Sequence, residues 1–145
     1  MDWAVFACPL VTDWVNEHFT THVAKVQPGG PWEYEGRLVG LINVEAYSQA
    51  EHTALLLQVA GGTLVGSPTN GCNGDITSVA LPGGMAARFS GQAVRRPDGG
   101  QFQRVGVLPD VLAEPTPEGL GAGRAEVVEA AVRWLGEALQ GTTQG

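Results

Sequence analysis

Positive charge is scarce in this sequence. Its 145 residues include 8 lysines and arginines against 15 aspartates and glutamates, which gives a formal net charge of −7. Lys25 is the only lysine, and Arg95-Arg96 is the only pair of adjacent basic residues. Proteins that bind nucleic acid or an anionic membrane surface need clustered positive charge. We therefore expect neither nucleic acid nor a membrane as a partner.

Cysteines and long apolar runs are also scarce. Cys8 and Cys72 lie far apart and form neither a disulfide framework nor a CxxC metal motif. Residues 3–11 are apolar, but no basic segment precedes them, so they make a poor signal peptide. No run approaches the roughly 18 apolar residues of a membrane helix. We expect a cytoplasmic protein with reduced thiols, without membrane insertion and without a metal or other cofactor.

Residues 38–60 organise the rest of the chain. Residues 38–44 form a short apolar run with β-branched side chains, which predicts a buried strand. From Gln49 onward the apolar residues follow helical spacing. Ser48 stands between the two, at a tight strand-to-helix turn, where the free N–H groups and the dipole of the helix stabilise negative charge. We expect any chemical centre of the protein to lie at this turn.

The length and the hydrophobic fraction of 43% predict one globular domain over residues 1–145. A strand at 63–67 follows the predicted helix after a short link, which predicts a parallel crossover. The other expected elements are a strand at 3–11, a short helix through 12–18, strands at 76–81, 85–89 and 92–96, an extended piece at 105–110, a loop at 113–123 and an amphipathic C-terminal helix at 124–139.

A series of short motifs occurs in the order found in one known family. They are Ser48-Gln-Ala-Glu51, Leu64-Val-Gly-Ser-Pro-Thr69, Asn70-Gly-Cys-Asn-Gly-Asp75, Leu81-Pro-Gly-Gly84, Arg96-Pro-Asp-Gly99 and Gln103-Arg-Val-Gly-Val-Leu-Pro-Asp110. Each motif alone is a weak signal, but the ordered series is specific. On these residues the chain resembles the carboxyl-terminal processing (tail-specific) serine peptidases, and most closely their tricorn and interphotoreceptor retinoid-binding protein branch. The match covers residues 34–140.

The resemblance implies an α/β fold with a crotonase-like (ClpP/crotonase-type) core, a parallel crossover and additional β-hairpins. It also implies hydrolysis of a peptide or protein substrate, with Ser48 as the nucleophile. The predicted substrate contacts are Gln49, beside the nucleophile, and Gly71 and Asn73 in the aligned loop. A serine at the start of a helix can offer its own N–H to an oxyanion while its hydroxyl attacks.

The sequence departs from the family pattern in three ways. Cys72 stands where the processing proteases have a lysine base, and Gln103 stands where the tricorn-like branch has a glutamate. We expect neither residue to function in catalysis. The family's upstream strand and glycine-rich loop are not recognisable before residue 34, and residues 1–33 are only weakly placed. We therefore expect the chain to correspond to the C-terminal portion of a peptidase catalytic domain.

Simpler interpretations compete at each candidate residue. Ser48 and Glu51 form Ser-x-x-Glu, the pattern of a helix capping box. His52 lies four positions after the serine, where it is either a proton acceptor or a polar residue of the helix surface. His18 and His22 have the spacing of a metal-binding pair if their segment is helical, but no third ligand is evident.

Two functional hypotheses therefore stay open. The first is an active serine-type peptidase with Ser48 as its nucleophile, in which Lys25, His18, His22 or another subunit supplies the base and the oxyanion partner. The second is a non-catalytic module that binds peptides or proteins and keeps only the peptidase fold. In both cases exposed apolar strand edges predict a homo-oligomer.

Overall fold

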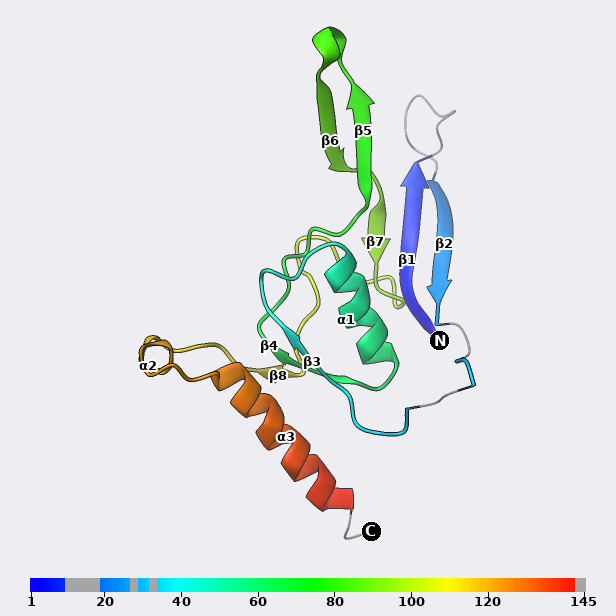
Figure 1. The fold of residues 1–145 in the computed structure, drawn as a ribbon. Coiled ribbons are helices and arrows are strands. Elements are labelled where there is room, and N and C mark those ends of the chain that lie inside the picture. The colour runs from blue at the N-terminus through cyan, green and yellow to red at the C-terminus, as the bar shows by residue number, and fades with distance from the viewer. Residues whose placement is uncertain (10–18, 27–28, 32–33, 143–145) are drawn as a thin grey trace.

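The computed structural model of the chain describes residues 1–9, 19–26, 29–31 and 34–142. Helices and strands form a mixed α/β fold whose centre is a three-stranded parallel sheet in the order β3-β4-β8. Its strands are β3 (Val39–Ile42), β4 (Thr63–Gly66) and β8 (Val111–Leu112). Helix α1 (Gln49–Val59) connects the parallel strands β3 and β4, so the predicted crossover is confirmed (Figure 1).

The core lies where α1 meets the central sheet. Helix α1 packs against β1, β3 and β4, and Ala54 and Leu55 bury their side chains there. A Cβ atom at Gly40 would lie only 2.8 Å from Leu64 Cδ2, so glycine at this strand position lets the side chains of helix and sheet interlock. The other buried members of this core are Ala4, Ala24, Ile42, Val94, Phe102 and Val107.

A second sheet contains the N-terminal residues in the order β2-β1-β7. Strand β1 (Asp2–Pro9) lies antiparallel between β2 (Phe19–Lys25) and β7 (Ala93–Arg95). The strand predicted at the N-terminus is thus present, whereas the helix predicted through residues 12–18 lies outside the described residues. His22 lies in a strand and not in a helix. The expected pairing of His18 and His22 on one helical face, as metal ligands, therefore fails at His22.

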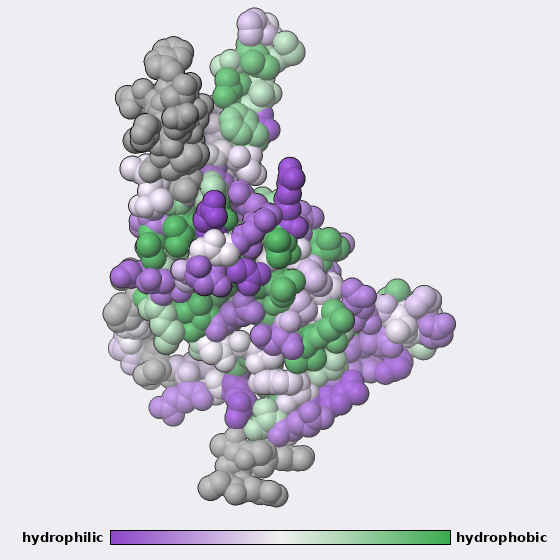
Figure 2. Space-filling view, turned by 180° about the vertical axis from the view of Figure 1, so that it is seen from behind, coloured by the Kyte–Doolittle hydropathy of each residue, from purple (hydrophilic) through white to green (hydrophobic). Residues whose placement is uncertain are grey.

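Strands β5 (Ile76–Ala80) and β6 (Ala86–Ser90) form an antiparallel hairpin, here called the hairpin arm. The arm turns through a short 3₁₀ helix, η1 (Pro82–Gly84), and projects from the rest of the molecule (Figure 1). It pairs with no other described strand. Its exposed apolar side chains give it a largely hydrophobic surface in Figure 2; the large ones are Ile76, Val79, Leu81, Met85 and Phe89.

The C-terminal third contains two elements that the sequence did not predict. Strand β8 begins at Val111, directly after the predicted extended piece at 105–110. Residues 113–123 are not all loop, because α2 (Pro117–Gly121) forms behind a Thr116 cap whose side chain accepts a hydrogen bond from the Gly119 N–H. A threonine followed by proline is a helix-start signal that the many glycines and prolines of this segment obscured.

Helix α3 (Glu126–Thr142) ends the described chain and packs against β3 and β4. Its first turn is tied to the start of α2, because the Glu126 carboxylate accepts hydrogen bonds from the Thr116 N–H and hydroxyl. Among the described residues, no helix combines the length and the apolar character needed to cross a membrane.

Candidate functional site

Ser48 occupies the turn between β3 and α1 in an unusual backbone conformation. Its φ is 52° and its ψ is −115°, a combination that side-chain-bearing residues rarely adopt. Ser48 is the N-cap residue of α1, yet its side chain makes no capping hydrogen bond. The capping-box interpretation is therefore wrong, and the strained turn presents a hydroxyl that the helix does not use.

Glu51, the other half of the expected capping box, points into the core. It is fully buried, and its Oε1 accepts hydrogen bonds of 2.6 Å from both the Thr69 hydroxyl and the Gly71 N–H. The Thr69 oxygen in turn accepts a hydrogen bond of 2.8 Å from the Val107 N–H. This chain of buried hydrogen bonds fixes the loop after β4 against the first turn of α1.

Ser48 lines a pocket of about 460 Å³ at the N-terminal end of α1. The residues around it come from five separate parts of the sequence: β1, β2, the start of α1, the loop after β4 and the residue before β7. The lining residues are Phe6, His22, Ser48, Gln49, His52, Asn73, Asp75 and Gln92. The pocket thus combines a hydroxyl, two imidazoles, a carboxylate and three carboxamides.

Phe6 contacts both imidazoles of this pocket. Its ring stacks on His22 at a centroid distance of 6.4 Å and meets His52 edge-on at 5.4 Å. Burial lowers the pKa of His52 below its ordinary value of 6.5, although the negative charges of Glu51 and Asp75 act in the opposite direction. At neutral pH the His52 imidazole is therefore uncharged and able to accept a proton.

The loop after β4 contributes Asn73 and Asp75 to the pocket but not its cysteine. Asn73 is 1% exposed, whereas the free Cys72 thiol is exposed and is not among the lining residues. Gly71 is buried and also lies outside the lining set, and its N–H is bound to Glu51. Of the three predicted substrate contacts, Gln49 and Asn73 therefore border the pocket and Gly71 supports it.

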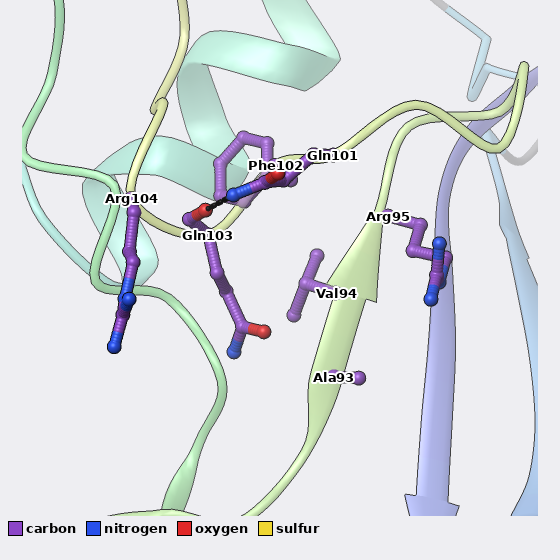
Figure 3. A pocket seen from close by; sticks show the side chains of 7 residues that line it. All are labelled: Ala93, Val94, Arg95, Gln101, Phe102, Gln103 and Arg104. Carbon is purple, nitrogen blue, oxygen red and sulfur yellow. Dashed lines mark hydrogen bonds between the residues drawn. The ribbon is translucent and has the colours of Figure 1, made fainter.

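Gln103 supports the same loop from the other side. Its Nε2 donates hydrogen bonds of 2.7 Å to the Asn73 carbonyl and 2.8 Å to the Gln92 carbonyl. A neighbouring pocket of about 380 Å³ is formed by β7 and residues 101–104, and Gln103 extends into it between Arg104 and Val94 (Figure 3). Gln103 thus connects the walls of the two pockets. A carboxylate at this position could not make the same two hydrogen bonds, because both need a donor and an ionised carboxylate only accepts.

Sequence reasoning placed Ser48, Gln49, His52 and Asn73 around one site and named His22 among the possible bases, but it missed the other residues of the pocket. Phe6 and His22 reach it through the antiparallel pairing of β1 and β2, which no local motif signals. For Asp75 the sequence indicates only a turn-forming motif. Its positive φ of 53°, directly after Gly74 with a φ of 156°, brings it back toward the pocket.

A parallel crossover with a serine at the strained start of its helix is typical of serine-type hydrolases with α/β folds. The comparison with protein families is more specific. The model of Peptidase family S41 matches residues 12–113, so the chain belongs to this family. No curated protein sequence matches the chain significantly.

Solved structures agree with this assignment. A putative peptidase from Parabacteroides merdae superposes with a TM-score of 0.80 at 24% identity, over 93% of this chain and 42% of its own length. Tricorn protease gives a TM-score of 0.65 at 27% identity over 72% of this chain and 11% of its own. The photosystem II D1 C-terminal processing protease gives a TM-score of 0.55 at 25% identity, over 79% of this chain and 28% of its own length. The chain therefore spans less than half the length of each of these proteins.

Proposed function

We propose that this chain provides the nucleophile of a serine-type peptidase, with Ser48 attacking the peptide bond of a peptide or protein substrate. The observation that carries this proposal is the conformation of Ser48. Its strained φ, its hydroxyl that makes no capping hydrogen bond and its position in the pocket wall are what a nucleophile at a strand-to-helix turn requires. The membership in Peptidase family S41 supports a peptide as the substrate.

The chemistry needs a proton acceptor near Ser48. In the first step the hydroxyl oxygen bonds to the substrate carbonyl carbon, and its proton passes to an imidazole. That proton then leaves on the amine of the broken peptide bond, and water hydrolyses the acyl-enzyme. We propose His52 as the acceptor because its lowered pKa keeps it neutral and because it lies on the face of α1 that follows Ser48. His22 is the alternative imidazole in the same pocket.

We further propose that the fold is the crotonase-like core of this family and that the chain corresponds to the C-terminal portion of its catalytic domain. The parallel crossover and the partial coverage of the related structures support this assignment. Gln49 and Asn73 then contact substrate from the pocket wall, while Cys72 and Gln103 take no part in proton transfer.

Covalent labelling tests the proposal directly. Incubation with a fluorophosphonate, followed by intact-mass analysis, should give one adduct on the wild-type chain and none on Ser48→Ala. Ser67→Ala is the matched control, since Ser67 directly follows β4 and lies outside the pocket, and it should keep the adduct. An unlabelled wild-type chain that is shown to be folded would refute a functional nucleophile.

Two further variants assign the base. His52→Gln should slow labelling about a hundredfold or more, in the range typical of general bases, whereas His22→Gln should have a smaller effect. If His22→Gln slowed labelling more than His52→Gln, the role of the base would belong to His22 in β2 and not to His52 in α1.

The second candidate function is a non-catalytic module that binds peptides. It is favoured by the two departures from the family pattern, since Gln103 is committed to backbone hydrogen bonds and Cys72 is not among the residues that line the pocket. Under this alternative, titration calorimetry would detect a peptide bound by the wild type and by Ser48→Ala with equal affinity, and no hydrolysis product would form.

A further inference from the structure

Asn73 contains an unsatisfied polar group inside the candidate site. Its side chain is 1% exposed, and within the described part of the chain its Nδ2 has no hydrogen-bond partner. Asn73 nevertheless lines the pocket that Ser48 also lines. A buried donor without an acceptor costs free energy, so folded proteins seldom keep one without a reason. The expected reason in a binding pocket is an acceptor that arrives with the ligand.

The backbone around Asn73 is fixed in advance. Gln103 Nε2 donates to the Asn73 carbonyl at 2.7 Å, and the Gly71 N–H two positions earlier is bound to buried Glu51. The Arg104 N–H donates to the Gly71 carbonyl at 2.7 Å, which ties the same loop to a third segment. The backbone that carries the Asn73 side chain is therefore held by contacts that do not use its Nδ2 donor.

We propose that the Asn73 Nδ2 donates a hydrogen bond to the carbonyl oxygen that Ser48 attacks, and so stabilises the oxyanion. This inference rests on the proposed function of Ser48 as a nucleophile. When the Ser48 oxygen bonds to the carbonyl carbon, the electron pair of the C=O bond moves to oxygen, which becomes negatively charged. Asn73 donates a hydrogen bond in this step but transfers no proton, so the proton of the serine still goes to the imidazole. A preorganised neutral donor of this kind strengthens its bond as charge develops.

The rate of phosphonylation tests the proposal, because the phosphonyl oxygen occupies the position of the carbonyl oxygen. Asn73→Ala should label with the fluorophosphonate about a hundredfold more slowly than wild type, as for loss of one oxyanion donor. Asn70→Ala is the matched control from the same loop. Asn70 is exposed, lies outside the pocket and donates its Nδ2 to the Val44 carbonyl at 3.4 Å. This variant should label at the wild-type rate.

Equal rates for wild type and Asn73→Ala would overturn the proposal. A second measurement on the unmodified chain guards against a variant that fails to fold. In nitrogen-15-labelled protein, the side-chain NH₂ resonances of Asn73 should shift on addition of an N-acetylated tripeptide amide at high concentration, while those of Asn70 should not. Asn73 resonances that stay unchanged would contradict the assignment of this donor to a peptide carbonyl.

These measurements also separate the two proposals from each other. If the wild-type chain takes up no fluorophosphonate but the Asn73 resonances shift with the peptide, Ser48 is not a working nucleophile and Asn73 still binds a carbonyl. If labelling is normal and Asn73→Ala labels at the wild-type rate, the peptidase proposal stands and the role of Asn73 fails.

Discussion

The carboxylate of Glu51 and the hydroxyl of Thr69 share a hydrogen bond of 2.6 Å in the interior of the protein. Glu51 lies one helical turn after Ser48, and Thr69 belongs to the loop that leads from β4 to Asn73. The same Glu51 oxygen also accepts the Gly71 N–H at 2.6 Å. One buried side chain therefore connects the start of α1, where Ser48 lies, to the loop opposite it.

We predict that Glu51→Ala lowers the free energy of unfolding by about 2–4 kcal/mol, since the Thr69 hydroxyl and the Gly71 N–H each lose a buried acceptor worth about 1–3 kcal/mol. Glu51→Gln keeps one oxygen acceptor and should lose much less. Urea denaturation measures both changes. Glu45→Ala is the control, because Glu45 is exposed and lies just before the same helix. If the Glu51→Ala variant were as stable as this control, the role assigned to the carboxylate would be contradicted.

The strain at Ser48 leads to a second prediction. Glycine adopts positive φ at little cost, so Ser48→Gly should stabilise the fold by about 1 kcal/mol while abolishing covalent labelling. Ser48→Ala keeps the Cβ atom and the strain, and should leave stability nearly unchanged. Thermal or urea unfolding of the three proteins decides between these outcomes. If Ser48→Gly were less stable than Ser48→Ala, the turn would not be strained by its side chain.

Much of the fold follows from local signals in the sequence. Short apolar runs predicted β3 and β4, helical spacing predicted α1, and the short links between them predicted the parallel connection, because these signals are set by neighbouring residues. Strand β2 and the sheet order β2-β1-β7 were not predictable in this way. They depend on pairing between residues far apart in the sequence, such as Phe6 and Val94, and no short pattern encodes such a contact.

The candidate site likewise has one feature that local signals predict and one that depends on contacts between distant residues. The turn at Ser48 was predictable because a strand and a helix meet there. The Ser-x-x-Glu pattern nevertheless favoured a capping box, since spacing alone does not reveal that Thr69 and Gly71 offer Glu51 two buried donors. Long-range hydrogen bonding overrode a local preference at this point.

The hairpin arm leads to a third prediction, that the chain self-associates. Cross-strand pairs place Thr77 opposite Phe89 and Val79 opposite Ala87, so one face of the arm is apolar and exposed. A two-stranded hairpin without a covering partner is marginally stable in water, and its apolar face favours association. Light scattering over a range of concentrations should detect oligomers.

A matched pair of variants locates this association on the arm. Phe89→Ser should reduce it, whereas Ile76→Ser changes the opposite face, since Ile76 pairs with Ser90, and should reduce it less. A monodisperse wild-type monomer at every concentration would contradict the prediction, as would equal effects of the two variants.

The fourth prediction concerns pH and follows from the lowered pKa of His52. Burial disfavours the charged imidazole in the folded chain, while the unfolded chain titrates near the ordinary value of 6.5. Between the lowered folded pKa and 6.5, the unfolded state binds more protons than the folded state. Stability should therefore rise with pH through this window, be complete above it, and be lost as the pH falls through it.

Urea denaturation of wild type and His52→Gln between about pH 5 and pH 8 measures this contribution. The variant cannot take up a proton at this position, so the acid-side loss of stability should be smaller than in wild type. His22→Gln is the control, since it removes the other imidazole of the pocket from an exposed strand position and leaves His52 in place. If His52→Gln kept the full wild-type slope, the protonation that destabilises the fold would lie on another group. In that case the neutral His52 base proposed for Ser48 would lose its physical support.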